Sequence, residues 1–425
     1  MARVPASEVT RKRLSALFDG KFNQSNLMRE AIRLIIEETL EAEVSEALGR
    51  GYYEHGEGAG YRNGYRVGKL KSAEGRVEYA VPQVADTASP WKSEVKQALL
   101  GRTEELERLA IEMYARGLSM RDIEAAFTDV TGQCVLTRSA ASLVTERLWE
   151  DYQAFACRGL HEPRVLYLFV DGIAEKLHLG QPREAVLAAW GIAANGAKVL
   201  LALAPGTKED LPCAREFLRD LTARGMNEPV LVISDGAPGL IRAIEEVFPK
   251  SPRQRCLAHK LRNLEGKVPE ERWREVKALA VAAYQAASPM MARLLKDEFV
   301  KRYERELPSA TACFLDDFEA CIAHLRLPIA HRRAIRTTNL LERLFGEERR
   351  RTKVIPHAFG ERAVLKLMYA ALIRASQTWK RIVVSDFELK QIEELREELE
   401  AEFRKRNETV KLSASQRHLS SKNRT

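Results

Sequence analysis

The stretch "LYLFVDGIAEKL", residues 166–177, decides the fold, because it starts as a buried strand and then presents a carboxylate. Residues 165–170 are a continuous run of β-branched, aromatic and aliphatic side chains, which predicts a strand inside a sheet. Asp171 and Gly172 follow directly. Open α/β sheets commonly place ligand-binding groups where a strand leaves the core, but an Asp-Gly pair is also ordinary turn composition. Residues elsewhere in the chain decide between these two interpretations.

A second acid repeats this arrangement in "PVLVISDGAPGL", residues 229–240. Asp235 follows an apolar run there and precedes Gly236. Two acids that leave the same end of neighbouring strands repel one another unless cations neutralise them. Hard Mg²⁺ prefers carboxylate oxygens, and paired divalent ions activate the attacking oxygen and stabilise the leaving oxygen of a phosphodiester. The two strand ends therefore predict a metal site for phosphodiester chemistry.

A third acid is expected to complete this site, and Glu342 stands out in "RTTNLLERLFGEERRRTK", residues 336–353. Seven residues along an α-helix correspond to a rotation of about 700°, so Arg349 lies within about 20° of Glu342 on one helix face. The candidate metal ligand Glu342 and the candidate phosphate-binding residue Arg349 thus lie on the same helix face. Alternatively, Asn339 and Glu342 resemble a capping box, in which the glutamate only bonds the start of its own helix.

The pattern around the first two acids predicts a mixed α/β sheet. The expected order is strands at 165–170, 185–195, 198–204 and 229–236, with helices at 209–224 and 239–247. Asn195 and Gly196 predict a hairpin turn between the second and third strands. Residues 266–335 have no strand signals and predict a helical insertion. Within the insertion, Trp273 is either a core residue or a platform that stacks on an unpaired base.

The N-terminal part predicts a helix, a loop and a small hairpin. Residues 25–49, capped by Ser25, have the apolar spacing of an amphipathic helix. Residues 50–65 are rich in Gly, Tyr and Arg and predict a loop, which either contacts nucleic acid or is a solvated linker. Short runs of alternating apolar and polar residues around 77–84 suggest the hairpin.

The next segment predicts a helix-turn-helix unit. Its pattern gives one helix, a turn at Gly117, a second helix capped by Ser119, and a third helix opened by Thr137 or Ser139. The third helix carries Arg138 and has the position of one that enters a major groove. Three-helix clusters that bind no DNA are also common, so both interpretations stay open.

The C-terminal part predicts further helices. They are expected at 361–376 and 386–407, and the second of them is charged all round with acid-base pairs four residues apart, which is typical of a solvent-exposed helix. The final dozen residues are polar and are expected to be disordered.

The composition is that of a basic, soluble protein. The 425 residues include 68 Lys and Arg against 60 Asp and Glu, a net charge of +8, which suggests a polyanionic partner. The six cysteines are scattered without a CxxC pair, so neither a disulfide framework nor a four-cysteine zinc site is expected. No apolar run of about 18 residues and no signal-peptide pattern occurs, so a cytoplasmic protein is expected.

Four motifs in register resemble those of the mutator-type transposases of bacterial insertion sequences. They are "FVDGI", "VISDGAPGL", "RQRCLAHKLRN" and "RTTNLLERLFGEERRRTKVI". The similarity covers most of the chain and includes "GYRNGYR" near residue 61 and "YARGLSMRDIE" in the helix-turn-helix segment. Each motif alone is weak, whereas four of them in this order are specific.

This resemblance implies an α/β fold, with a ribonuclease-H-like mixed-sheet core that an all-α insertion interrupts, and a mainly α-helical N-terminal DNA-binding region. The implied domains begin with a helix, loop and hairpin for dimerisation or DNA binding (residues 1–100) and a helix-turn-helix-like DNA-binding domain (101–160). The first part of the core (161–265), the all-helical insertion (266–335) and the last core helices with the glutamate (336–380) follow. A charged helix with a disordered tail (381–425) ends the chain.

The resemblance also implies the chemistry of a DDE transposase. Asp171, Asp235 and Glu342 would be the catalytic triad and the ligands of two Mg²⁺ or Mn²⁺ ions. Water frees a 3′-hydroxyl at a transposon end, and that hydroxyl attacks a target phosphodiester. The implied partners are double-stranded DNA, both terminal inverted repeats and target, and a second copy of the chain in a dimer. A nucleoid location on DNA and no membrane partner are expected.

Further side chains are expected on DNA. Cys256 and His259 match the family's Cys-x-x-His motif, which is half a zinc site at best, and His259 is expected near the scissile phosphate. The basic residues after the glutamate are expected to grip DNA without sequence preference. The predicted DNA contacts are Arg62, Asn63, Arg138, Cys256, His259, Lys260, Arg262, Asn263, Asn339, Arg349, Arg350, Arg351 and Lys353.

Two rival functions stay open from the sequence. A nuclease or junction resolvase on the same core would use the same acids but only hydrolyse DNA. A catalytically idle DNA-binding protein descended from a transposase would act through the helix-turn-helix alone.

Overall fold

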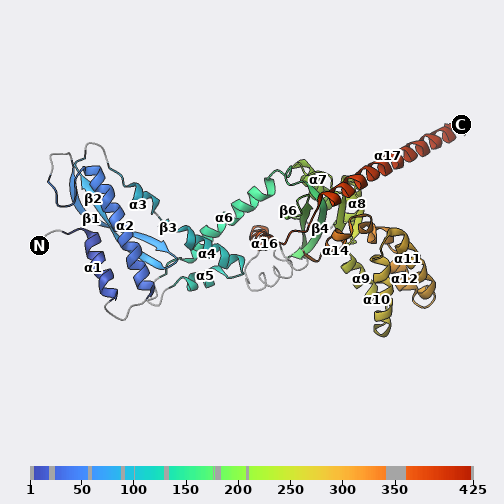
Figure 1. The fold of residues 1–425 in the computed structure, drawn as a ribbon, viewed down its shortest axis with the longest axis horizontal. Coiled ribbons are helices and arrows are strands. Elements are labelled where there is room, and N and C mark those ends of the chain that lie inside the picture. The colour runs from blue at the N-terminus through green and yellow to red at the C-terminus, as the bar shows by residue number, and fades with distance from the viewer. Residues whose placement is uncertain are drawn as a thin grey trace. The chain divides into compact units, whose positions relative to one another are not determined.

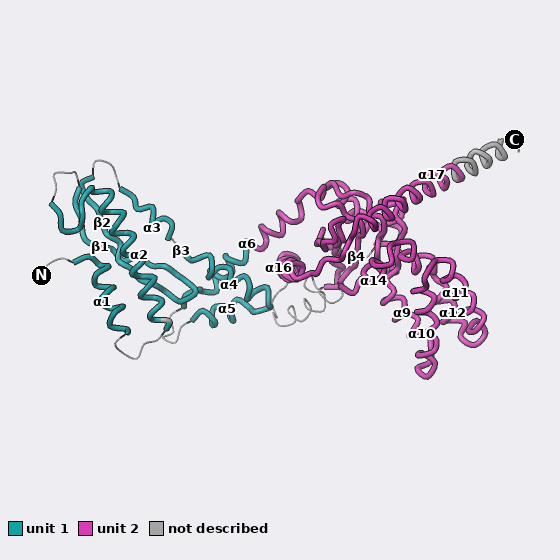
Figure 2. The backbone as a smooth tube through the Cα atoms, viewed as in Figure 1, with its two compact units in different colours: residues 1–147 teal, residues 148–425 magenta. Residues whose placement is uncertain are grey.

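A computed structural model of the chain forms two compact units, residues 1–147 and residues 148–425 (Figure 2). The residues that the structure describes are 4–18, 24–55, 60–87, 91–99, 101–128, 134–175, 177, 183–206, 210–340 and 360–422. Each unit has its own core, and the two are described separately.

The first unit combines helices with a small sheet (Figure 1). Its elements are α1 (Ala6–Phe18), α2 (Gln24–Leu48), β1 (Tyr61–Ser72), β2 (Gly75–Ala85), α3 (Glu94–Ala98), β3 (Gly101–Arg102), α4 (Glu104–Ala115), α5 (Met120–Ala126) and the start of α6 (Arg138–Cys157). The sheet order is β2-β1-β3, with β1 and β2 antiparallel. Apolar side chains of α2, such as Ile36 and Leu40, pack on Val77 and Val81 of β2.

Strand β1 corrects one prediction. Residues 61–65 were expected in a loop, but β1 begins at Tyr61 and pairs with β2 as far as Ser72. The register shifts between Arg62 and Tyr65, and most of the strand's first seven side chains are exposed. A β-bulge and an exposed face remove the alternation of apolar residues by which a strand is recognised.

The predicted helix-turn-helix helices are present. Gly117 follows α4 with a φ of 94°, and Ser119 opens α5 in a capping box with Asp122. Helix α6 begins at Arg138, and the Thr137 hydroxyl accepts the amide of Ala140 at 3.3 Å, so Thr137 caps α6.

The second unit is built on a mixed sheet. Its first elements are β4 (Val165–Glu175), β5 (Glu184–Ala193), β6 (Lys198–Pro205), α7 (Leu211–Ala223), β7 (Leu231–Ser234), α8 (Pro238–Val247), β8 (Arg253–Arg255) and α9 (Leu257–Glu265). The described strands have the order β6-β5-β4-β7-β8, antiparallel from β6 to β4 and parallel from β4 to β8. The predicted mixed α/β sheet is confirmed.

The sheet lies between two apolar layers, because successive side chains of a strand point to opposite faces. Tyr167 and Phe169 of β4 face a core cluster that includes residues of α16 and α17. Leu168 and Val170 face a second cluster with α7 and α8. Strands buried on both faces have near-continuous apolar sequences, as residues 165–170 do.

Helices fill the insertion between α9 and residue 336, as predicted. They are α10 (Glu270–Tyr284), α11 (Pro289–Tyr303), α12 (Pro308–Leu315), α13 (Phe318–Cys321), the 3₁₀ helix η1 (Ala323–Arg326) and α14 (Ile329–Ile335). Phe299 and Phe314 stack at the centre of their core with ring centroids 3.8 Å apart. Trp273 packs against this core while the Lys277 ammonium lies over its ring, which favours the core interpretation of Trp273.

The C-terminal helices are α16 (Glu361–Ser376), at the predicted position, and α17 (Asp386–Lys422). The prediction that the last helix is exposed all round is wrong, because Ile392, Leu395 and Leu399 are buried against the sheet cluster. Helix α17 extends to Lys422, into the final dozen residues that were expected to be disordered.

The hairpin turn at Gly196 gives a first testable prediction. Gly196 has a φ of 76°, and a Cβ there would lie 2.0 Å from the carbonyl oxygen of Ile382. We expect Gly196→Ala to lower the free energy of unfolding by about 3 kcal/mol or more, because left-handed strain adds to a backbone clash. Urea unfolding followed by circular dichroism measures this change.

Gly64 provides the matched control for this prediction. Its φ of 75° is almost the same, but a Cβ there meets nothing within 4 Å. Gly64→Ala should therefore cost only the backbone strain, about 1–2 kcal/mol. Equal costs at the two glycines would contradict a steric role for Ile382.

Candidate active site

Asp171 of β4 and Asp235, which directly follows β7, come at corresponding positions of two neighbouring strands. Phe169 of β4 is the register partner of Ile233 of β7, and each acid follows its partner by two residues in the chain. Neighbouring strands are about 5 Å apart, so the two acids are within reach of shared cations. Alternation along β4 assigns Asp171 to the face of Phe169, and Asp235 directly follows the last residue of β7.

The position of Asp171 corrects the strand end that was predicted. Strand β4 continues to Glu175, and Asp171 lies inside it, paired with Ala188 of β5. Its side chain is only 5% exposed, and its Oδ1 accepts the amide of Gly172 at 3.0 Å. A carboxylate inside a buried strand is costly unless other groups compensate it, which makes this position a candidate functional site.

Asp235 stands at the junction of β7 and α8. Its Oδ1 accepts the amide of Ala237 at 3.1 Å, and the Ser234 hydroxyl donates to its carbonyl oxygen. Ala237 is the N-cap position of α8, so this carboxylate satisfies an amide of the helix start. The turn thereby holds the second acid at the carboxyl end of the parallel strands.

Glu342 and the basic residues Arg349, Arg350, Arg351 and Lys353 lie outside the described residues. Leu340, two residues before Glu342, packs on the same cluster as Phe169 and Ile233. The described chain therefore brings the sequence before Glu342 to the face of the sheet that carries Asp171. Within the described ranges, no group of three or more His, Cys, Asp or Glu side chains is arranged to hold a metal ion.

The sequence interpretation missed one further acid on this face. Glu175 follows Asp171 by four residues on β4, is 8% exposed, and is the register partner of Glu184 on β5. The signal for Glu175 was its even spacing from Asp171, which becomes meaningful only when the strand is known to extend past residue 170.

Cys256 and His259 form a network at the start of α9. Cys256 is fully buried, and its Sγ accepts both the amide and the hydroxyl of Thr338 at 3.3 Å. Its own amide donates to the carbonyl oxygen of Ser234 at 2.8 Å. Cys256 therefore touches the residue before Asp235 and the segment that leads to Glu342.

The contacts of Cys256 affect the pKa of its thiol and give it an internal role. Burial raises the pKa of the thiol, but hydrogen bonds with His259 and Thr338 lower it, and the result lies below the ordinary value. Since Cys256 is buried, the prediction that it contacts DNA is corrected to an internal role. His259 is half-buried beside it.

We expect Cys256→Ala to lower the free energy of unfolding by about 1–3 kcal/mol, because the buried amide and hydroxyl of Thr338 lose their acceptor. Cys256→Ser keeps an acceptor and should cost less. Urea unfolding followed by tryptophan fluorescence compares the two variants. If serine were as damaging as alanine, the acceptor role of the sulfur would be wrong.

Lys260 corrects a second predicted DNA contact. It is fully buried, and its ammonium bonds the backbone oxygen of Asp316 and lies 3.4 Å from Asp316 Oδ2. A lysine held in this way is an internal cation of the fold. Arg262 and Asn263, two and three residues further along α9, are exposed, as is Asn339.

Comparisons with known proteins identify the family. The family description "Transposase, Mutator family" matches residues 7–382. The chain belongs to the mutator family of transposases. It is 31% identical over 368 residues to the transposase for insertion sequence element ISRM5 of Rhizobium meliloti (strain 1021), with 86% of this chain and 92% of that relative covered.

Two further relatives carry the same kind of name. The transposase for insertion sequence element IS6120 of Mycolicibacterium smegmatis is 32% identical over 271 residues, 64% of this chain and 84% of that relative. The transposase for IS406 of Burkholderia multivorans (strain ATCC 17616 / 249) is 31% identical over 356 residues, 82% of this chain and 90% of that relative. None of the described helices of this mutator-family chain is long and apolar enough to span a bilayer.

The remaining predicted DNA contacts of this mutator-family chain lie in the first unit. Arg62 is held by Glu41 at 3.3 Å and Ser45 at 2.8 Å, with its guanidinium over the ring of Tyr52. Asn63 beside it is exposed. Arg138 is exposed at the start of α6 and pairs with Glu124 at 3.4 Å. Asn63 and Arg138 are thus accessible, whereas Arg62 is largely committed to α2.

Proposed function

We propose that this protein is a DNA transposase that binds the terminal inverted repeats of an insertion sequence, cleaves the DNA to free a 3′-hydroxyl and joins that hydroxyl to target DNA. The observation that carries the proposal is the placement of Asp171 and Asp235 at corresponding positions of two neighbouring strands in a mutator-family chain. Acids at this spacing fit divalent cations, and divalent cations fit phosphodiester chemistry.

The strand order supports a ribonuclease-H-like core within this proposal. Strands β4, β5 and β6 form a consecutive antiparallel meander, and β7 and β8 add in parallel on the other side of β4. The first aspartate stands on the central strand β4 and the second directly after its parallel neighbour. Such a core would bring both acids together at neighbouring positions of the sheet, where a nucleic-acid strand can approach.

The residues present fit Mg²⁺ or Mn²⁺, because the candidate ligands are carboxylate oxygens and no soft ligand stands among them. Asp171, Asp235 and Glu342 would hold two such ions. When bound, these ions supply activation of the attacking oxygen and stabilisation of the leaving oxygen. The buried surroundings of Asp171 limit access of water to this carboxylate, which strengthens its charge interactions.

Other side chains would position the DNA. Exposed Arg262 and Asn263 on α9 stand one turn after His259 and suit the strand next to the cut. Arg349, Arg350, Arg351 and Lys353 would grip the backbone of the transferred strand and target. Helix α6 with Arg138 would read the inverted repeat, and since two transposon ends are handled together, a dimer on DNA is the proposed working unit.

A strand-transfer assay with pre-cut ends tests the proposal. The protein, Mg²⁺ or Mn²⁺, a 3′-hydroxyl end fragment and a target plasmid should give covalently joined product, and Glu342→Gln should give none. A nuclease or resolvase would cleave but yield no joined DNA. An idle DNA-binding protein would shift the fragment in a gel without cleaving or joining it.

A further inference from the structure

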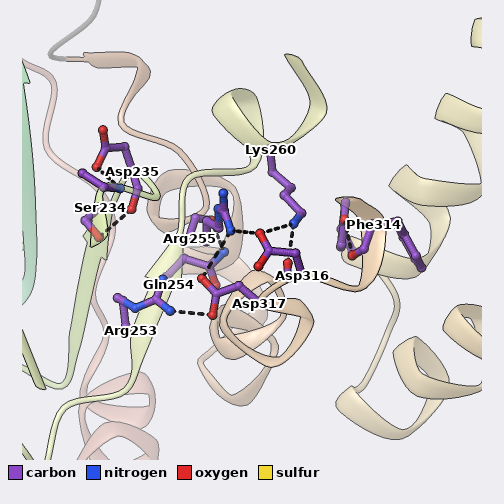
Figure 3. A network of polar contacts seen from close by, with 11 residues as sticks. Ser234, Asp235, Arg253, Gln254, Arg255, Lys260, Phe314, Asp316 and Asp317 are labelled. Atoms are coloured by element: carbon purple, nitrogen blue, oxygen red, sulfur yellow. Dashed lines mark hydrogen bonds and ion pairs between the residues drawn. The ribbon is translucent and has the colours of Figure 1, made fainter. Parts of the chain in front are cut away.

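Two acids of the helical insertion enclose cations from β8 and α9 (Figure 3). Asp316 Oδ2 lies 2.6 Å from Arg255 Nη1 and 3.4 Å from the ammonium of Lys260. Asp317, which precedes α13 with a φ of 59°, bonds Arg253 through Oδ1 and lies 3.6 Å from Arg255 through Oδ2. Arg255 thus forms ion pairs with two successive acids of the insertion.

This network holds Arg255 in one orientation. Arg255 is 8% exposed and Lys260 is fully buried, so their charges need these partners. The hydrogen bond from Arg255 and the charge of Lys260 outweigh the effect of burial and hold the pKa of Asp316 below its ordinary value. Arg255 Nη1 donates a hydrogen bond to Asp316 and forms a longer ion pair with Asp317, and these two contacts restrict the orientation of the guanidinium.

The other side of the Arg255 guanidinium lies against the turn that carries Asp235. A Cβ at Gly236 would lie 2.4 Å from Arg255 Nη2 and 2.7 Å from its Cζ. Arg255 therefore packs directly on Gly236, and a larger side chain at this position would displace the guanidinium. This turn is also where Asp235 Oδ1 accepts the amide of Ala237, and Figure 3 shows Arg255 between Asp235 and Asp316.

We propose that Arg255 is a positioning residue for Asp235, and that Asp316 and Asp317 of the helical insertion hold it in that role. The insertion thereby fixes the turn between β7 and α8 at which Asp235 presents its carboxylate. This inference rests on the proposed metal-binding role of Asp235. The insertion, which interrupts the core in sequence, is joined to the active site through these two acids.

Hydrogen exchange measured by mass spectrometry or NMR tests the positioning role without metal or DNA. In full-length Arg255→Lys and Asp316→Asn, the amides of Gly236 and Ala237 should exchange about tenfold faster than in the unaltered chain, because the guanidinium that packs on Gly236 is replaced in the first variant and loses its hydrogen bond to residue 316 in the second. Unchanged exchange at these amides in both variants overturns the proposal. An increase spread evenly over residues 148–425 overturns it as well, since that would be general destabilisation.

Glu319→Gln is the matched control. Glu319 forms a bidentate ion pair with Arg293 in the same insertion, at 3.0 and 2.8 Å, but both side chains are exposed. Loss of this pair should leave exchange at Gly236 and Ala237 unchanged. Faster exchange there in Glu319→Gln would show that any loss of charge in the insertion is enough, and would overturn the specific role of Asp316.

Mn²⁺ binding, followed by the electron paramagnetic resonance signal of the free ion, separates this inference from the proposed function. Arg255→Lys and Asp316→Asn should weaken binding about 10- to 100-fold, as loss of groups that orient metal ligands does. If Asp235→Asn binds Mn²⁺ as the unaltered chain does, the metal role of Asp235 fails, while the exchange result still decides the role of Arg255. If only Asp235→Asn weakens binding, the positioning role is overturned.

Discussion

Asp171→Asn and Asp235→Asn are expected to lower DNA cleavage and joining by at least about 1000-fold while DNA binding persists. Each change removes a negative oxygen where β4 and β7 bring the two acids to corresponding positions. A 1000-fold loss corresponds to about 4 kcal/mol of transition-state stabilisation, a plausible size for a ligand of catalytic cations. Single-turnover cleavage of end-containing DNA in Mg²⁺ and in Mn²⁺ measures the rate, and fluorescence anisotropy measures binding.

The free energy of unfolding of Asp171→Asn should stay the same or rise, although its activity falls. Asp171 is 5% exposed inside a strand, so its charge is costly in the absence of cations. The nearly isosteric amide removes that charge, and urea unfolding without metal should show Asp171→Asn to be as stable as the unaltered chain or more stable. A loss of activity that merely followed a loss of stability would contradict a catalytic role.

Asp210→Asn is the matched control for both variants. Asp210 is the N-cap of α7 in the same unit, and its side chain accepts the amide of Cys213 at 3.1 Å. Asparagine caps a helix as well as aspartate does, so the same chemical change there should leave the fold and the reaction intact. Cleavage at the normal rate by Asp235→Asn would contradict the assignment of the two aspartates as catalytic residues.

Local patterns predicted much of the second unit. Continuous apolar runs gave the strands, Asn195 and Gly196 gave the hairpin turn, and helical spacing gave α16. These features depend on residues that are close in sequence, where propensity and turn chemistry act directly. The two aspartates could be singled out because an acid beside a buried apolar run conflicts with its surroundings.

Features that depend on contacts between residues far apart in the sequence could not be predicted. Nothing near Lys260 shows that Asp316 covers it, because the partner comes from another part of the insertion. In α17, by contrast, the spacing of Ile392, Leu395 and Leu399 is a helical stripe that the many charges concealed. The bulge in β1 likewise broke an alternation that is otherwise readable.

The burial of Lys260 leads to the second large expected effect. Lys260→Ala should lower the free energy of unfolding by about 3 kcal/mol, because it removes the ammonium that bonds Asp316 and leaves a cavity where the lysine stem was. Lys260→Met keeps most of the stem and should cost less. Urea unfolding followed by tryptophan fluorescence measures both. Lys250→Ala is the control, since its ion pair with Glu400 is exposed and should contribute less than about 1 kcal/mol.

DNA binding separates Lys260 from its exposed neighbour on α9. The dependence of affinity on salt counts the phosphates that a protein neutralises, and each lost contact reduces the slope by about one. Arg262→Ala should reduce this slope, because Arg262 is exposed on α9, whereas Lys260→Met should leave it unchanged. Anisotropy titrations of end-containing DNA between low and moderate salt give both slopes. A reduced slope for Lys260→Met would mean that the lysine leaves Asp316 for DNA, and the internal role assigned to it would then be wrong.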